Sequence, residues 1–194
     1  MTLRHAVALL LVATSVAACR KKDPPVDGPG PVAAANGSDA AARARADSIA
    51  AAERARREAE ERDLAAGVAR VREALSDVVY FDYDSNELTD AAQGKLRTKA
   101  AILRANPGLE VRVDGHADER GSTEYNLTLS QRRAETVRDF LAGYGIAPSR
   151  IATIPYGEER PMAEGTGESV WAQNRRAEFA MTGGQITVIP PEVR

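Results

Sequence analysis

Two charged side chains, an acid and a base fifteen positions apart, are the residues of this sequence best suited to bind a ligand together. Asp118 follows a predicted strand, and Arg133 lies inside the predicted helix that comes next. A carboxylate accepts hydrogen bonds from an ammonium, while the fork of a guanidinium binds a carboxylate through two parallel bonds. Free N–H groups at the start of a helix also favour anions. The arrangement predicts a non-catalytic pocket for a zwitterion, the end group of an amino acid.

A structural salt bridge between loop and helix is the alternative interpretation of this pair, and spacing alone favours it. Gly121 favours a pocket instead, because glycine lets the backbone approach a ligand closely. Asn126 is expected to cap the helix and to orient the ligand. Arg120 on the loop is expected to touch the ligand or a partner. Arg132 points about 100° away from Arg133 around the helix, which indicates a solvated charge.

Other chemistries are poorly supported by the same stretch. His116, Asp118, Glu119 and Glu124 do not resemble a zinc site, which normally draws several ligands from histidine and cysteine. Acid–base hydrolysis by Asp118 and Glu119 has no support either, because neighbours in sequence need not face one another. We therefore expect no metal, no cofactor and no enzymatic activity.

The stretch Gly115–Arg133 resembles the peptidoglycan-associated lipoprotein and OmpA C-terminal domain family. The family pattern is G-x-x-D-x-x-G-x-x-x-Y-N-x-x-L-S-x-x-R-A, and the similarity extends from about Val78 to Thr182. The resemblance implies binding of peptidoglycan through the diaminopimelate of its stem peptide, gripped by Asp118 and Arg133. The positions that match the pattern are Gly115, Asp118, Gly121, Tyr125, Asn126, Leu129, Ser130, Arg133 and Ala134.

Three further segments carry the resemblance: YFDYDS at 80–85, YGEERP at 156–161 and NRRAEF at 174–179. Asp82 flanks the pocket in the family resembled, although a carboxylate that caps a turn is an equal alternative. Arg175 and Arg176 are expected to support the pocket from beneath rather than to touch the ligand, with pairing to Glu158 and Glu159 as the alternative. The expected peptidoglycan-binding residues are therefore Asp118, Arg133, Asn126, Asp82, Arg120 and Leu129.

Hydrophobic periodicity indicates which elements position these residues. Alternation of Leu109, Val111 and Val113 with polar residues predicts a strand with one wet face, and spacings of three or four predict amphipathic helices. The order is β-α-β-α-β-β over residues 77–182, which fits an α+β domain with a mixed four-stranded sheet and helices on one face. The predicted strands are 78–82, 109–115, 151–156 and 177–182, the helices 89–105 and 126–141, with a helical turn at 170–175.

Residues 1–18 are predicted to form a lipoprotein signal peptide. Its apolar run ends in Val16-Ala17-Ala18-Cys19, which looks like a lipobox, so Cys19 is expected to carry acyl chains such as palmitate; an ordinary secretory signal is the alternative. Two or three chains anchor firmly, at about 0.8 kcal/mol per buried CH₂. By resemblance to enteric lipoproteins, Arg20 in place of aspartate favours export to the outer membrane.

Between the anchor and the domain the composition changes twice. Residues 19–38 are rich in Pro, Gly and Ala, which predicts a disordered tether. Residues 39–76 are rich in Ala, Arg and Glu, which predicts a charged helical stalk whose last turns dock on the domain or on a second chain. The stalk is expected to be monomeric, with a coiled-coil dimer as the alternative. Residues 183–194 form a tail beyond the domain, as an edge strand or a loose end.

The distribution of charge along the chain excludes nucleic acids as partners. Residues 77–182 carry 13 basic and 17 acidic side chains, a net charge of −4, and residues 39–76 carry 8 of each. Neither segment offers the basic surface that nucleic-acid binding needs. With the resemblance, the sequence predicts a periplasm-facing outer-membrane lipoprotein that binds peptidoglycan in a Tol-Pal-like system for envelope integrity and cell division. The alternative is an interaction module whose main partner is a TolB-like periplasmic protein.

Overall fold

The computed structural model describes residues 35–193 of the 194-residue chain. The predicted signal peptide, Cys19 and most of the predicted tether lie outside the described residues. The chain divides into two units, which meet after Ile49, and the second, Ala50–Arg194, contains the sheet. None of the helices in the described part of the chain is long and apolar enough to cross a membrane.

The elements follow the predicted order, with some shifted boundaries. The first helix begins at Ala35, upstream of the predicted stalk boundary. The edge strand near residue 80 is shorter than predicted, and the helix after Asp118 begins earlier and ends later. The elements are α1 (Ala35–Ser76), β1 (Val79–Tyr80), α2 (Asp90–Ala105), β2 (Glu110–Gly115), α3 (Thr123–Gly143), η1 (Pro148–Arg150), β3 (Ile151–Pro155), α4 (Glu168–Asn174), β4 (Arg176–Gly183) and η2 (Pro191–Val193).

The four strands form one mixed sheet in the order β1-β4-β2-β3. β2 pairs parallel with β3, in a register that sets Val111 opposite Ile151, and antiparallel with β4, where Val113 faces Phe179. α3 provides the crossover that a parallel pair requires. The predicted fold class, an α+β domain with a mixed four-stranded sheet, is confirmed.

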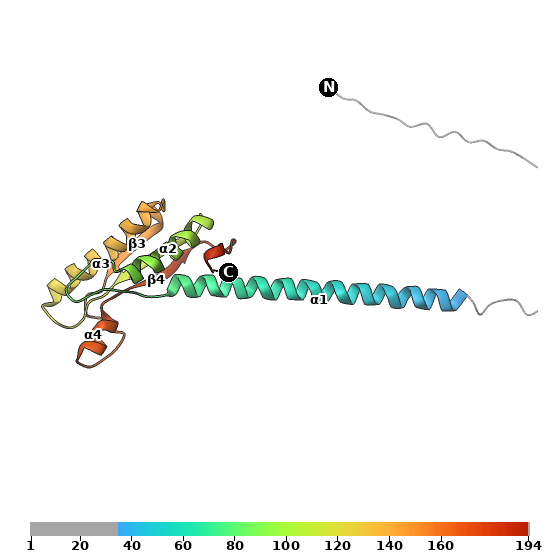
Figure 1. Ribbon diagram of the computed structural model, residues 1–194, viewed down its shortest axis with the longest axis horizontal. Coiled ribbons are helices and arrows are strands. Elements are labelled where there is room, and N and C mark those ends of the chain that lie inside the picture. Colours follow the sequence, from blue (N-terminus) through green and yellow to red (C-terminus); the bar gives the residue numbers. More distant parts are fainter. Residues whose placement is uncertain (1–34, 194) are drawn as a thin grey trace, which may run out of the picture. The chain divides into compact units, whose positions relative to one another are not determined.

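Helices α2 and α3 cover one face of this sheet (Figure 1). Leu96 and Leu103 of α2 and Leu141 of α3 are fully buried together with Val113 of β2. Burying each such side chain contributes about 1.5–3 kcal/mol. The start of α2 is fixed by Thr89, whose side chain accepts a hydrogen bond from the Ala92 N–H. The other face of β2 carries polar residues, which explains the alternation in its sequence.

The last turns of α1 pack into the same core. Val71 and Leu75 are buried, as predicted for the docking turns of the stalk. Lys99 of α2 is also completely buried, and its ammonium donates hydrogen bonds of 2.7 Å to the carbonyl oxygens of Ala74 and Leu75. These carbonyls lie at the end of a helix, where no intrahelical donor is available. Lys99 thus closes the end of α1 inside the protein.

The C-terminal tail packs on the domain, which corrects the prediction that it lies beyond it. Ile186, Ile189 and Val193 lie against the core, and no strand forms among the described tail residues. The buried Asn106 side chain holds the tail: its oxygen accepts bonds from two backbone N–H groups, and its NH₂ donates to the Val188 carbonyl. The tail ends beside α1 (Figure 1), where Arg70 donates to the Val193 carbonyl at 3.3 Å.

Candidate functional site

The loop between β2 and α3 is fixed at both ends. A Cβ on Gly115 would lie 2.1 Å from the carbonyl oxygen of Ser130 in α3, so only glycine allows the strand to end this close to the helix. Ser122 caps α3, because its hydroxyl accepts a hydrogen bond from the Tyr125 N–H at 3.2 Å. The prediction that Asn126 is the cap was therefore wrong. The helix starts one turn earlier, and its N-terminus lies at the pocket.

A pocket of about 230 Å³ opens where this loop, the start of α3 and the segments after β1 and α4 meet. It brings together Asp118 and Arg133, the pair that spacing suggested, with Arg120, Asn126 and Leu129. Charged and aromatic side chains dominate its wall. The lining residues are Tyr83, Asp84, Asp118, Arg120, Gly121, Tyr125, Asn126, Leu129, Arg133 and Arg175.

Arg133 is a cation without a carboxylate partner. Its side chain is completely buried, and it makes no ion pair with any residue of the described range 35–193. Three N–H groups donate to backbone carbonyls, those of Ser85 (2.8 Å), His116 (2.8 Å) and Asp82 (3.1 Å). Burial lowers its pKa to about 10, so it remains charged at neutral pH. A guanidinium has five N–H donors, so two remain for a ligand in the pocket.

Asp118 has cation partners already, though not Arg133. Arg120 donates to both of its carboxylate oxygens, from Nε at 3.1 Å and from Nη2 at 2.6 Å, and the Arg120 backbone N–H adds a third bond at 3.1 Å. Nη1 of Arg175 donates a longer hydrogen bond, of 3.4 Å, to Oδ2 of Asp118. Burial by itself raises the pKa of Asp118, but these hydrogen bonds outweigh it and leave the pKa below its usual value. Asp118 is therefore ionised at neutral pH.

Arg120 lies between two aromatic rings. Its guanidinium carbon is 3.9 Å from the ring centroid of Tyr83 and 4.2 Å from that of Trp171. Trp171, on α4, donates a 2.9 Å hydrogen bond to Glu119. The stack joins three segments that are distant in the sequence over one side of the pocket.

Asn126 and Leu129 reach the pocket from the first two turns of α3. Asn126 is buried, and its NH₂ donates to the Asp118 carbonyl at 3.0 Å and to Glu158 at 2.6 Å. It therefore fixes the loop that carries Asp118, and Glu158 ties the YGEERP segment to the same place. Leu129 is nearly buried and supplies an apolar part of the lining.

Asp84 lines the pocket in place of Asp82, which was predicted to bind the ligand. The pocket lining does not include Asp82, whose carbonyl holds Arg133 and which borders a neighbouring cavity. Asp84 lines the pocket and accepts a short hydrogen bond from the Tyr125 hydroxyl. Its φ is 53°, and among the described residues it is the only non-glycine residue with positive φ. Backbone strain of this kind is concentrated at functional sites.

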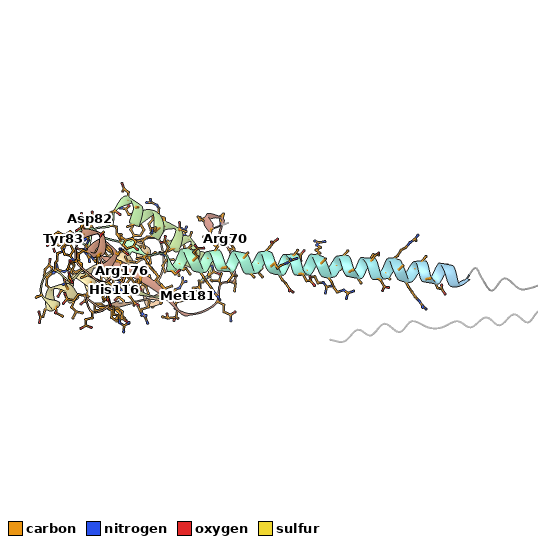
Figure 2. All side chains as sticks on the ribbon, turned by 90° about the horizontal axis from the view of Figure 1, so that it is seen from below. Arg70, Asp82, Tyr83, His116, Arg176 and Met181 are labelled. Carbon is orange, nitrogen blue, oxygen red and sulfur yellow. The ribbon has the colours of Figure 1, made fainter. Side chains whose placement is uncertain are left out.

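His116 supports the site from the polar face of the sheet. Its ring is 2% exposed and stacks on Tyr156, with 5.4 Å between the ring centroids. In the described part of the chain, neither ring nitrogen has a hydrogen-bond partner. Burial, assisted by Arg176, lowers the pKa of His116 to about 4, so the ring is neutral at pH 7. The His116 backbone N–H also donates to the Arg176 carbonyl at 2.9 Å, and both residues are labelled in Figure 2.

Five lining residues were not among the predicted binding residues: Tyr83, Asp84, Gly121, Tyr125 and Arg175. All five lie in segments that carry the family resemblance, which is the sequence signal that could have indicated them. Arg175 was expected to lie beneath the site. It donates to the Phe81 carbonyl, contacts Asp118 at 3.4 Å, pairs with Glu168 at 2.5 Å and itself lines the pocket.

Comparison with known proteins agrees with this architecture. Residues 80–175 match the OmpA family. The peptidoglycan-associated lipoprotein of Brucella melitensis is 45% identical over 109 residues, which cover 56% of this chain and 65% of the relative. That of Haemophilus influenzae is 43% identical over 102 residues, covering 53% of this chain and 67% of the relative.

A solved structure extends the comparison to three dimensions. The crystal structure of the peptidoglycan-associated lipoprotein from Burkholderia pseudomallei shares 41% sequence identity and superimposes with a TM-score of 0.53, covering 54% of this chain and 89% of that one. Fold and site together define a domain with an OmpA-like mixed sheet and a charged pocket at the end of β2. The chain belongs to the OmpA family, and its relatives from Brucella, Haemophilus and Burkholderia are named peptidoglycan-associated lipoproteins.

Proposed function

We propose that the pocket binds peptidoglycan through the amino-acid end group of diaminopimelate in the stem peptide, without turnover. The observation that carries the proposal is Arg133, a buried cation that lines a pocket and lacks a carboxylate partner in the described chain. A buried charge without a counter-ion is costly, and a ligand carboxylate would supply one. The names of the relatives support the same ligand class.

The two ends of the zwitterion go to opposite charges in the pocket. The ligand carboxylate binds the unused donors of Arg133, with help from the N-terminus of α3, whose dipole favours anions. The ligand ammonium binds Asp118, and Asp84 contributes a second negative charge to the same lining. Binding of this kind needs no acid–base chemistry, which fits a domain that holds its ligand rather than converting it.

The rest of the chain adapts this pocket to the bacterial envelope in our proposal. Acyl chains on Cys19 hold the protein in the outer membrane, facing the periplasm, and the segment up to α1 carries the domain toward the cell wall. The protein would then connect outer membrane and wall non-covalently, within a Tol-Pal-like system. The lipobox and the named relatives support this role.

Retention on purified cell-wall sacculi tests the pocket. Asp118→Ala, Arg133→Ala and Arg133→Lys should each reduce the pelleted fraction, and we expect affinity to fall at least about tenfold because a buried charge loses its partner. Arg132→Ala is the matched control, since Arg132 is the exposed neighbour of Arg133 on the same helix. Circular dichroism verifies that each variant is folded. Undiminished retention of folded Arg133 variants contradicts the proposal.

A second candidate function, binding of a TolB-like periplasmic protein, is favoured by the exposed side chains in this region. Tyr83 is 59% exposed, Tyr125 48% and Leu127 45%. Large exposed side chains grouped in this way are typical of protein interfaces. If a partner uses this surface, muropeptides should compete with it for the domain. A partner that docks on α1 would bind equally well with and without muropeptide.

A further inference from the structure

The carboxylate of Asp118 has no acceptor site left in the free protein. A carboxylate offers about four lone-pair sites. Oδ1 accepts from the backbone N–H and the Nε of Arg120, while Oδ2 accepts from Nη2 of Arg120 and Nη1 of Arg175. A ligand ammonium can therefore reach Asp118 only if one of these donors leaves.

Of the two guanidinium groups on Asp118, that of Arg120 is the one able to move. Arg175 has a side chain only 7% exposed, and it is tied to the Phe81 carbonyl of the core. The side chain of Arg120 is 28% exposed, and apart from Asp118 its contacts are with side chains at the surface. One of these is Glu168, which is 64% exposed and has an oxygen 3.8 Å from Arg120 Nη2. Glu168 offers a carboxylate that Arg120 can pair with after leaving Asp118.

We propose that Arg120 determines the specificity of the pocket, because its guanidinium holds the position on Asp118 that the ligand ammonium takes on binding. The inference rests on the proposed function and adds a rule for which ligands bind. Arg120 and the ligand compete for one carboxylate. The Tyr83 and Trp171 rings stabilise Arg120 in the bound position through cation–π contacts, which strengthens the competition.

This specificity separates ligands that carry only an ammonium from zwitterions, which carry a carboxylate as well. A simple amine that displaces Arg120 replaces one set of charged hydrogen bonds with a similar set and gains little. A zwitterion makes the same exchange and adds a carboxylate on Arg133, which has no counter-ion in the described chain. The pocket should accordingly reject amines such as cadaverine and accept the end group of diaminopimelate. Specificity then depends on the cost of displacing Arg120 from Asp118 as well as on the attraction between the ligand carboxylate and Arg133.

The chain contains a reporter for the movement of Arg120. Trp171 is its only tryptophan, and the ring lies 4.2 Å from the Arg120 guanidinium. Displacement of Arg120 removes a cation from the indole face. The fluorescence of Trp171 should therefore change when a ligand takes the place of Arg120, and the change needs no added label.

The experiment is a titration of the chain with a diaminopimelate tripeptide and with cadaverine, followed by calorimetry and by Trp171 fluorescence. We expect the native chain to bind the tripeptide with a change in emission and not to bind cadaverine. Arg120→Ala should bind the tripeptide about tenfold more tightly, since no hydrogen bonds must be broken first. It should also bind cadaverine measurably, and its emission should no longer respond to the tripeptide.

Two further variants separate charge from hydrogen bonding and from general effects. Arg120→Lys keeps the positive charge but lacks the planar fork, so its affinity should fall between those of the native chain and Arg120→Ala. Arg160→Ala is the matched control, because Arg160 also stacks on an aromatic ring, that of Tyr156 at 3.9 Å, without lining the pocket. It should behave like the native chain.

The outcomes distinguish this inference from the proposed function. Equal or weaker tripeptide binding by folded Arg120→Ala, or binding to the native chain without a change in Trp171 emission, overturns the role of Arg120 and leaves the pocket in place. Failure of the native chain to bind the tripeptide at all overturns both.

Discussion

Two cations of this domain are completely buried, and the comparison between them separates a structural charge from a binding charge. Lys99 and Arg133 are both 0% exposed, and both donate to backbone carbonyls. Each also lies over an aromatic ring, Lys99 at 4.4 Å from the Phe179 centroid and Arg133 at 5.2 Å from that of Phe81. In partners and burial the two sites are alike.

They differ in what lies on the remaining side of the cation. Lys99 is enclosed by the end of α1 and by Phe179, and its ammonium satisfies helix carbonyls that have no other donor. Arg133 lines a pocket, and two of its five N–H groups are left after its three bonds to backbone carbonyls. Burial of a cation without a carboxylate partner therefore does not by itself indicate a binding site. The adjoining pocket is the feature that distinguishes Arg133 from Lys99. Figure 2 places Tyr83 of the pocket and Arg70, next to the docked tail, toward opposite ends of the domain.

The largest expected effect tests the structural side of this comparison. Lys99→Met removes two hydrogen bonds and leaves the Ala74 and Leu75 carbonyls buried without donors, so the free energy of unfolding should fall by about 3 kcal/mol. Chemical denaturation measures it. Lys95→Met is the control, since Lys95 is partly exposed and should cost about 1 kcal/mol or less. Retention on sacculi by folded Lys99→Met should be unchanged, and a loss of binding there would erase the distinction between the two cations.

A second prediction concerns the pH dependence of stability, which we expect to arise at His116, the residue whose carbonyl binds Arg133. The pKa of His116 is about 4 in the folded chain and 6.5 as its ordinary value, so between these values the unfolded chain binds more protons. Stability is then lost as pH falls from about 6.5, by about 2 kcal/mol at pH 4.5. Burial lowers the pKa of Lys99 to about 7, so below pH 6 it is protonated in both states and adds nothing.

Denaturation curves measured from pH 6.0 to 4.5, where Lys99 is protonated in both states, check this dependence. His116→Phe retains a ring against Tyr156 and should flatten the curve over this range. An equally steep curve in that variant would assign the dependence to carboxylates instead.

The smallest effect distinguishes two helical glycines. Gly94 of α2 has open space where a Cβ would lie, so Gly94→Ala should stabilise the chain by about 0.7 kcal/mol. At Gly67 of α1 the Cβ would lie 2.1 Å from Cδ1 of Ile189 in the tail, so Ile189 must shift and the gain should vanish. Differential scanning calorimetry resolves the two. A similar rise in Tm for both variants would show that the tail does not pack on α1 in solution.

The sequence predicted the fold well where the signal was local. Alternating Val111 and Val113 predicted β2, and the spacing of Leu96, Ala100 and Leu103 predicted the buried face of α2. The start of α3 was missed by one turn, because both Ser122 and Asn126 are capable caps and only the geometry selects between them. The tail was missed because its few apolar residues form no pattern.

The amino-acid sequence by itself determined the class of the protein and the main pair of its pocket. The motif from Gly115 to Ala134 marks Asp118 and Arg133, and the strand, loop and helix that carry them are short-range properties of the chain. Only the tertiary structure decided that Arg120 and Arg175 already hold Asp118, that Arg133 has no carboxylate partner in the described chain, and that Asp84 faces the pocket. These outcomes depend on contacts between segments up to about a hundred residues apart, as between Phe81 and Arg175. Local propensity carries no information about which charges meet at that distance, because burial and packing of the whole domain select the partners.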